Sequence, residues 1–280
     1  MIYRKVDLYE YYKIERKNKE KGILTVYCRS NHEEVNINRK YPGILVCPGG
    51  GYWFTSFREA EPIALKFVEH NIQAFVLDYS CFNDGVYPAQ FLEGYLARKY
   101  IHEHKDEFML DETKLGIIGF SAGGHFAGLL SNNHKKDDFN SYSKDLPDFR
   151  YGAYIYPVNY FSREGAHQDS FLNLTHSDFE TIKHLDFDKI VSKDSPIGFI
   201  VSSFEDDAVG YKNTMDLAKA YSDNNVPFEL HIFNRGKHGI SLGDENVYKK
   251  SDCTPDRKIF GTWIDMLFNF LKVNNITINE

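Results

Sequence analysis

The sequence predicts a doubly wound α/β fold, in which helices cover both faces of a mostly parallel β-sheet. Short apolar, β-branched runs alternate along the chain with longer segments of helical periodicity. The apolar runs are nearly continuous in hydrophobicity, as expected for parallel strands that are buried on both faces. Because no repeat, low-complexity tract or Pro/Gly-rich linker divides the 280 residues, we expect a single domain over residues 1–280.

Each expected element follows from one of these two patterns. The expected strands are residues 23–28, 43–47, 73–77, 115–118, 151–156, 197–202 and 228–233. The expected helices are residues 59–70, 88–104, 123–130, 216–223 and 258–272. In the first of these helices, Ile63, Phe67 and His70 fall along one stripe. A parallel sheet of this kind presents its reactive groups at the carboxyl ends of its strands.

Residues 159–194 interrupt the alternation of strands and helices. They are polar, aromatic and irregular, with only a weak helical stretch over residues 178–185. An insertion of this kind forms a lid, one wall of a pocket, or a plain surface excursion. We expect a lid or a pocket wall.

Composition and charge exclude several classes of function. The net charge is −7 and the pI is about 5.9, with no run of basic residues, so we expect no nucleic-acid partner. The N-terminal residues lack an apolar signal region and no stretch is apolar enough to cross a bilayer, so we expect a cytoplasmic protein without membrane contact. The 4 cysteines are widely spaced and contain no C-x-x-C pair, which argues against a disulfide framework and a zinc site.

The stretch GFSAGGH, residues 119–125, places a serine between glycines where a strand passes into a helix. Gly119-x-Ser121-x-Gly123 is the pattern of a nucleophile elbow, in which small neighbours allow a tight turn that exposes the serine hydroxyl. A glycine-rich turn without chemistry is the alternative. The context of strand and helix favours a nucleophile.

A serine nucleophile needs a histidine base and a carboxylate that orients this base. In a fold of this kind the partners follow in the order serine, acid, histidine. The segment SFEDDAVG contains Glu205, Asp206 and Asp207 just after one expected strand, and NRGKHGI contains His238 just after the next. We therefore expect Ser121, one of these carboxylates and His238 to meet at one edge of the sheet.

The loop CPGGGYW, residues 47–53, follows another expected strand and contains consecutive glycines. The N–H groups of Gly50 and Gly51, together with that of Ala122 after the serine, are expected to form an oxyanion hole. The loop lacks the G-K-[ST] ending of a phosphate-binding loop.

Four ordered motifs resemble those of α/β-hydrolase esterases of the acetyl-esterase and acetyl-xylan-esterase-like group, which are related to the hormone-sensitive-lipase-type esterases. The motifs are CPGGGYWFTSFREAEPIALKF, GFSAGGHFAG, FEDDAVG and ELHIFNRGKHGISL. The resemblance runs from about residue 40 to the C-terminus and implies an α/β-hydrolase fold. It implies Ser121 as nucleophile, His238 as general base, and Gly50, Gly51 and Ala122 as oxyanion donors.

The same resemblance selects the acid of the triad. The family pattern has Asp followed three positions later by Val, which matches Asp206 with Val209 and leaves Asp207 as the second choice. The chain departs from many relatives at Cys47, where they have histidine, and at Gly210, where they have proline. These departures affect the polarity beneath the oxyanion loop and the stiffness of the acid loop, but remove no catalytic group.

The resemblance implies a serine carboxylic-ester hydrolase that removes short acyl groups, such as acetyl, from sugars or oligosaccharides without a metal or an organic cofactor. The expected partner is a small-molecule or oligosaccharide ester, and we leave a homo-oligomer open. A serine peptidase of the acylaminoacyl or dipeptidyl type is one alternative, although such enzymes add a propeller domain for which these residues leave no room. A hydrolase-fold binding protein without activity is the other.

Further side chains near these motifs have less certain roles. Tyr52 and Trp53 are expected to line the substrate pocket, with a core position as the alternative. His125 follows the elbow, and we expect it to be packed and hydrogen-bonded rather than catalytic.

Charged side chains near the motifs also have two interpretations each. Arg58 and Glu59 either brace the oxyanion loop or, with Glu61, form a solvated helix start. His102 and His104 have a spacing seen in metal sites, but we expect no metal there.

Overall fold

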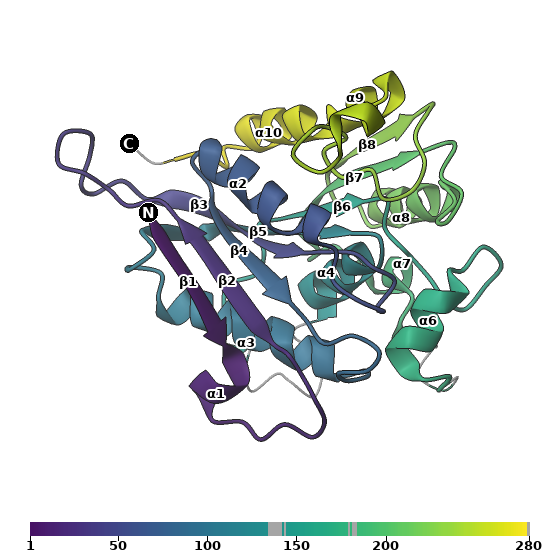
Figure 1. The fold of residues 1–280 in the computed structure, drawn as a ribbon, viewed down its shortest axis with the longest axis horizontal. Coiled ribbons are helices and arrows are strands. Elements are labelled where there is room, and N and C mark those ends of the chain that lie inside the picture. The colour runs from purple at the N-terminus through teal and green to yellow at the C-terminus, as the bar shows by residue number, and fades with distance from the viewer. Residues whose placement is uncertain (134–141, 143, 179, 181–183, 279–280) are drawn as a thin grey trace.

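The computed structural model describes residues 1–133, 142, 144–178, 180 and 184–278 (Figure 1). One eight-stranded sheet, with the order β1-β2-β4-β3-β5-β6-β7-β8, runs through the molecule. Its strands are β1 (Ile2–Asp7), β2 (Ile23–Cys28), β3 (Tyr41–Cys47), β4 (Gln73–Asp78), β5 (Leu110–Phe120), β6 (Tyr151–Ile155), β7 (Ile197–Ser203) and β8 (Phe228–Phe233). The β1–β2 and β2–β4 pairs are antiparallel, and all other pairs are parallel.

The helices and short 3₁₀ turns connect these strands. They are α1 (Leu8–Tyr12), η1 (Phe57–Glu59), α2 (Glu61–Glu69), α3 (Ala89–Glu103), α4 (Ala122–Asn133), α6 (Gln168–Thr175), α7 (Phe187–Ile190), α8 (Lys212–Asp223), η3 (Lys250–Asp252), α9 (Pro255–Gly261) and α10 (Trp263–Val273). None of the helices in the described part of the chain combines the length and the apolar composition that spanning a bilayer requires.

Helices cover both faces of the sheet, which confirms the predicted fold class (Figure 1). Alternate residues of β3 illustrate the reason: Ile44 and Val46 pack in the core on the side of α2, α9 and α10, whereas Leu45 packs in the core on the side of α3, α4 and α8. Because both faces are buried, the strand has to be apolar throughout.

The strand order brings two loops of the predicted site together. β3 pairs in parallel with β5, and Cys47 at the end of β3 lies opposite Gly119 near the end of β5. The chain passes from β3 outward to β4 and then returns to β5 on the other side of β3. A reversal of this kind leaves a crevice at the carboxyl ends of the two strands, where ligands bind in open α/β sheets.

Several elements differ from the sequence predictions. The strand β1 was not predicted, because its exposed and buried residues alternate at the edge of the sheet and include charged side chains. The predicted helix over residues 258–272 is divided at Thr262 into α9 and α10, and Gly261, the last residue of α9, lies so close to the Leu242 carbonyl oxygen that a Cβ would be 1.9 Å from it. The weak helical stretch predicted over 178–185 lies largely outside the described residues, and α6 and α7 flank it.

Candidate active site

Ser121 lies at the tight turn between β5 and α4, with a positive φ of 53°. A Cβ on Gly119 would lie 2.1 Å from the Gly123 carbonyl oxygen, and one on Gly123 would lie 2.2 Å from the Cys47 carbonyl oxygen. Both positions therefore require glycine, as the elbow pattern predicted. A serine held in a left-handed conformation carries backbone strain of a kind that clusters at functional sites.

His238 links Ser121 to Asp206. Its Nε2 lies 2.7 Å from the Ser121 Oγ, and its Nδ1 lies 2.8 Å from the Asp206 Oδ2. These distances form an unbroken hydrogen-bonded chain from hydroxyl to imidazole to carboxylate. The three side chains come from the loops after β5, β7 and β8, so the carboxyl edge of the sheet brings them together.

The two neighbouring carboxylates have opposite environments. Only 2% of the Asp206 side chain is exposed, and its Oδ1 accepts hydrogen bonds from the N–H groups of Ala208 (3.0 Å) and Val209 (2.8 Å). Asp207 instead faces solvent and pairs with Lys237 at 2.7 Å, which lowers the pKa of Asp207. The Asp206–Val209 spacing thus corresponds to a turn that fixes one carboxylate against His238.

The oxyanion loop after β3 has a backbone that only glycine adopts readily. Gly50 and Gly51 have positive φ values of 129° and 63°, and a Cβ on Gly50 would lie 2.0 Å from the Phe54 carbonyl oxygen. Among the described residues, the N–H groups of Gly50, Gly51 and Ala122 donate to no protein acceptor. Amides of this kind are available to a developing negative charge.

Glu59 lies beneath this loop and connects it to the loop that carries His238. It is 4% exposed, its Oε2 accepts from the Gly49 N–H at 2.9 Å, and its Oε1 accepts from the Tyr156 hydroxyl at 2.6 Å. The Tyr156 ring packs edge-on against the His238 ring, with 4.9 Å between centroids, and its oxygen accepts from the Ser241 N–H. Burial raises the pKa of Glu59, opposed by these hydrogen bonds and by the charge of His238.

Glu59 is buried and accepts a hydrogen bond from the oxyanion loop, so it braces this loop and does not form part of a solvated helix start. The Arg58 guanidinium lies over the Tyr248 ring, 5.0 Å from its centroid, and the Arg58 carbonyl accepts from the Ser241 hydroxyl. Glu61 accepts from the Tyr27 hydroxyl, away from the site.

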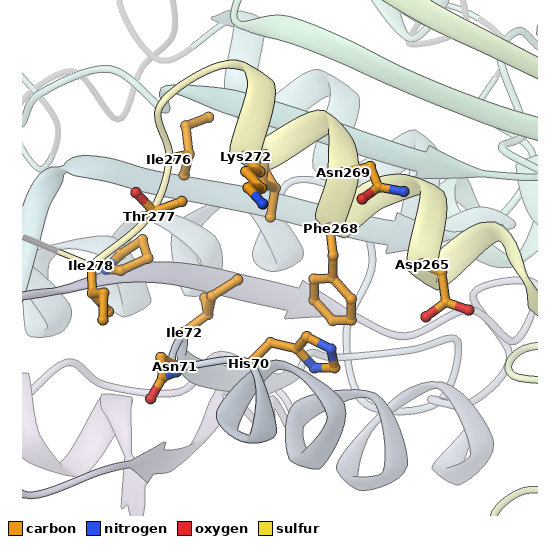
Figure 2. A pocket seen from close by; sticks show the side chains of 12 residues that line it. His70, Asn71, Ile72, Asp265, Phe268, Asn269, Lys272, Ile276, Thr277 and Ile278 are labelled. Atoms are coloured by element: carbon orange, nitrogen blue, oxygen red, sulfur yellow. The ribbon is translucent and has the colours of Figure 1, made fainter.

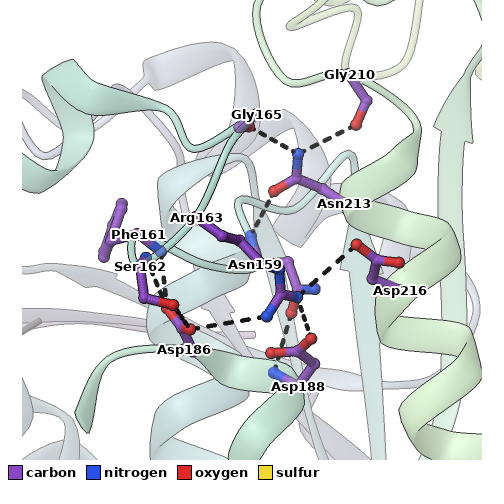
Figure 3. Close-up of polar contacts among 10 residues, drawn as sticks. All are labelled: Asn159, Phe161, Ser162, Arg163, Gly165, Asp186, Asp188, Gly210, Asn213 and Asp216. Atoms are coloured by element: carbon purple, nitrogen blue, oxygen red, sulfur yellow. Dashed lines mark hydrogen bonds and ion pairs between the residues drawn. The ribbon is translucent and has the colours of Figure 1, made fainter. Parts of the chain in front are cut away.

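The insertion over residues 159–194 is attached to both loops of the site. The Asn173 side chain donates to the Gly51 carbonyl at 2.8 Å. The Asn213 side chain, on α8, donates to the carbonyls of Gly165 and Gly210, and so joins the insertion to the acid loop (Figure 3). Sequence reasoning missed these contacts, because polar residues in an irregular segment carry no periodic signal.

Tyr52 and His125 belong to the core beneath the elbow. Both are fully buried, the Tyr52 hydroxyl lies 2.8 Å from the His125 Nδ1, and the His125 Nε2 lies 2.5 Å from the Leu185 carbonyl oxygen. Burial lowers the pKa of His125 to about 4, so the ring is neutral. The structure therefore agrees with a packed His125, but a buried Tyr52 offers no surface to a substrate, which corrects the pocket-lining prediction for this ring.

Trp53, in contrast, is 55% exposed and stacks on Phe82, with 4.8 Å between centroids. Its contact with substrate stays a prediction. His102 pairs with Glu112, and His104 lies between Glu107 and the Tyr11 hydroxyl. Across the described ranges, no cluster of three or more His, Cys, Asp or Glu side chains is arranged to hold a metal ion.

Two cavities in the described part of the chain lie at opposite ends of the sheet. A cavity of about 780 Å³ borders the acid loop; Asp206 and Ala208 line one part of it, Gly165 and Ala166 another, and Phe204 adds an aromatic wall. A cavity of about 440 Å³ lies between α2 and α10, where His70 stacks on Phe268 (Figure 2). Since Pro42 and Ile72 line this second cavity, it lies at the amino ends of β3 and β4, opposite Ser121.

Comparisons with known proteins agree on one group of relatives. The model of the BD-FAE family matches residues 32–221. The chain is 31% identical over 221 residues to endo-1,4-beta-xylanase B of Butyrivibrio fibrisolvens. The aligned region covers 76% of this chain and 34% of the xylanase, so the chain spans about a third of the length of that relative.

Solved structures provide a second comparison. An acetyl ester-xyloside bifunctional hydrolase from Caldicellulosiruptor lactoaceticus superimposes with a TM-score of 0.77 at 28% identity, over 91% of this chain and 89% of that one. A carboxylesterase from Lactobacillus plantarum superimposes with a TM-score of 0.83 over 100% of both chains; its 20% identity supports the α/β-hydrolase fold alone.

Proposed function

Because the chain belongs to the BD-FAE family, we propose that it is a serine carboxylic-ester hydrolase that works through an acyl-enzyme. The observation that carries this proposal is the hydrogen-bonded chain from the Ser121 Oγ through His238 to Asp206. The name of the Caldicellulosiruptor relative, an acetyl ester-xyloside bifunctional hydrolase, supports ester hydrolysis over a serine peptidase or an inactive binding protein.

Acylation begins when the Ser121 Oγ attacks the ester carbonyl carbon and its proton passes to the His238 Nε2. The carbonyl oxygen gains the negative charge and accepts hydrogen bonds from the N–H groups of Gly50, Gly51 and Ala122. The bond between the carbonyl carbon and the alcohol oxygen then breaks, and His238 returns its proton to the departing alcohol. The acyl group remains on Ser121.

Deacylation repeats these steps with water as the nucleophile. His238 takes a proton from the water molecule while the water oxygen attacks the acyl carbon. The bond between the acyl carbon and the Ser121 Oγ then breaks, and His238 returns the proton to the Ser121 Oγ. Asp206 accepts from the His238 Nδ1–H in both halves, which fixes the tautomer and stabilises the imidazolium. The reaction releases a carboxylic acid and an alcohol.

The substrate that we propose is a short acyl ester, such as an acetyl ester, of a sugar or oligosaccharide. The relatives include a xylanase and a hydrolase of acetyl esters and xylosides, both proteins whose names refer to xylose-based sugars. The exposed Trp53 ring beside the oxyanion loop provides a flat apolar surface of the kind on which a sugar ring stacks.

Substitution of the nucleophile tests the proposal. Ser121→Ala should abolish hydrolysis of p-nitrophenyl acetate and labelling by a fluorophosphonate probe, because among the described residues the Ser121 hydroxyl is the one that is hydrogen-bonded to His238. The exposed Ser251→Ala serves as the matched control, and circular dichroism checks that both variants fold. Retention of more than a few per cent of wild-type activity in Ser121→Ala would remove Ser121 from the mechanism.

A further inference from the structure

His167 lies in the insertion, between the two attachments that join this insertion to the site. On one side of it, the Gly165 carbonyl accepts from Asn213, whose amide also donates to Gly210 at the end of the acid loop (Figure 3). On the other side, Asn173 donates to Gly51 in the oxyanion loop. The chain at His167 therefore crosses from the acid side of the site to the oxyanion side.

The position of the His167 proton follows from its hydrogen bonds. The ring caps the N-terminus of α6: its Nδ1 accepts from the Ser170 backbone N–H at 3.2 Å and lies 2.8 Å from the Ser170 Oγ. A backbone N–H can only donate, so the Nδ1 is an acceptor and the neutral ring carries its hydrogen on Nε2. This Nε2 has no protein partner among the described residues.

Burial favours the neutral form of the ring, because it lowers the pKa of His167. A protonated His238 would lower this pKa further, whereas Asp169 and Asp206 oppose the shift. Ser170, which His167 contacts, also approaches the oxyanion loop: its Oγ lies 3.9 Å from the position that a Cβ on Gly51 would occupy. His167 thus presents a neutral N–H donor next to Ser170, beside the oxyanion loop.

The mechanism determines which half of the ester lies near this donor. The ester carbonyl oxygen accepts hydrogen bonds from the amides of the oxyanion loop. The departing alcohol oxygen has to reach the His238 Nε2 in order to receive its proton. The alcohol half consequently lies beside His238, and the insertion that carries His167 borders the site there, because Asn213 joins Gly165 of the insertion to Gly210 of the acid loop. A sugar alcohol carries further hydroxyl and ring oxygens within this space.

We propose that His167 binds the alcohol half of the substrate, by donating its Nε2–H to a hydroxyl or ring oxygen of a sugar, and so selects sugar esters over simple esters. This inference rests on the proposed function. A partly buried polar donor such as His167 disfavours an alcohol that offers no acceptor, because the donor loses water without gaining a partner.

The test compares two substitutions at this position. His167→Ala removes both the cap and the donor, whereas His167→Asn keeps a capping oxygen for the Ser170 N–H but lacks the reach of the imidazole Nε2. For each variant, kcat/KM is measured with acetylated xylobiose and with p-nitrophenyl acetate, whose alcohol half has no hydroxyl. We expect the ratio of the two kcat/KM values to fall about tenfold in both variants, mainly through a higher KM for the sugar ester.

The controls separate the inference from its premise. Gln168→Ala, at the exposed neighbouring position, should leave the ratio at its wild-type value. If the ratio of the two kcat/KM values keeps its wild-type value in His167→Asn but falls in His167→Ala, His167 only caps the N-terminus of α6. This result would overturn the inference. If the wild-type protein hydrolysed neither substrate, the proposed function would fail instead.

Discussion

At the residue scale, the choice between Asp206 and Asp207 is decided by backbone contacts. Two N–H groups and burial hold Asp206 against His238, whereas Asp207 points to solvent and to Lys237. The two side chains leave this turn in different directions, so only Asp206 can orient the imidazole.

Asp206→Asn should lower kcat for p-nitrophenyl acetate by about 10³- to 10⁴-fold, because a neutral amide does not stabilise the imidazolium that forms on His238. Asp207→Asn should change kcat little, since an exposed ion pair with Lys237 lies outside the proton path. Steady-state kinetics of both variants at one pH measures the ranking. A larger loss in Asp207→Asn would transfer the role of the acid to Asp207.

The sequence predicts the residues of the triad better than the residues around it. Ser121, Asp206 and His238 follow strands, and a parallel sheet brings the ends of its strands together. The structure brings these three side chains into contact, while their catalytic roles stay proposals. Tyr52 lies in the core, which its sequence context does not indicate, because an aromatic ring after a glycine loop suits a pocket wall as well as a core.

At the element scale, the buried strands were predictable and the edge and the insertion were not. Strands such as β3 are apolar on both faces, which leaves a continuous pattern in the sequence. The edge strand β1 mixes charged and apolar residues, and α6 is held by contacts with loops that lie far away along the chain. Contacts of this kind depend on the complete tertiary structure.

Glu59, in the short η1 turn, joins the oxyanion loop to the loop of His238. Glu59→Gln should lower kcat by about 10- to 100-fold, because an amide oxygen holds the Gly49 N–H less strongly and no negative charge faces His238. KM should change less than kcat, since the brace acts on the transition state and not on substrate binding. The measurement is the steady-state kinetics of p-nitrophenyl acetate hydrolysis.

Glu61→Gln is the matched control for this brace, because Glu61 lies two residues later and contacts Tyr27 away from the site. We expect wild-type kinetics in this variant. Equal losses in both variants, or a change confined to KM in Glu59→Gln, would mean that Glu59 does not position the oxyanion loop.

At the scale of the whole molecule, a buried carboxylate on α3 joins the N-terminal segment to the main sheet. Glu93 is fully buried and accepts hydrogen bonds from the Ser80 N–H, the Ser80 hydroxyl and the Tyr9 hydroxyl. Burial raises the pKa of Glu93 to about 8, opposed by these hydrogen bonds, and the nearby Glu20 adds to the rise. None of the hydrogen-bond partners of Glu93 belongs to the triad, so its titration concerns stability.

The raised pKa has a definite consequence for stability. A glutamate in the unfolded chain titrates near pH 4.3, so between about pH 4.5 and pH 8 the unfolded state has lost a proton that the folded state retains at Glu93. This group therefore contributes stability that is present in acid and is lost as the pH rises through that range. Above about pH 8 its contribution no longer changes.

Glu93→Gln removes this titration, because an amide stays neutral at every pH. We expect the free energy of unfolding of the variant, minus that of the wild type, to increase steadily from pH 5 to pH 8 by an amount on the order of 1 kcal/mol per pH unit at most. Urea unfolding monitored by circular dichroism at several pH values provides both quantities, with the exposed Glu245→Gln as control. A difference that stays constant over this range would show that Glu93 is ionised in the folded protein, and that its hydrogen bonds with Ser80 and Tyr9 outweigh the effect of burial.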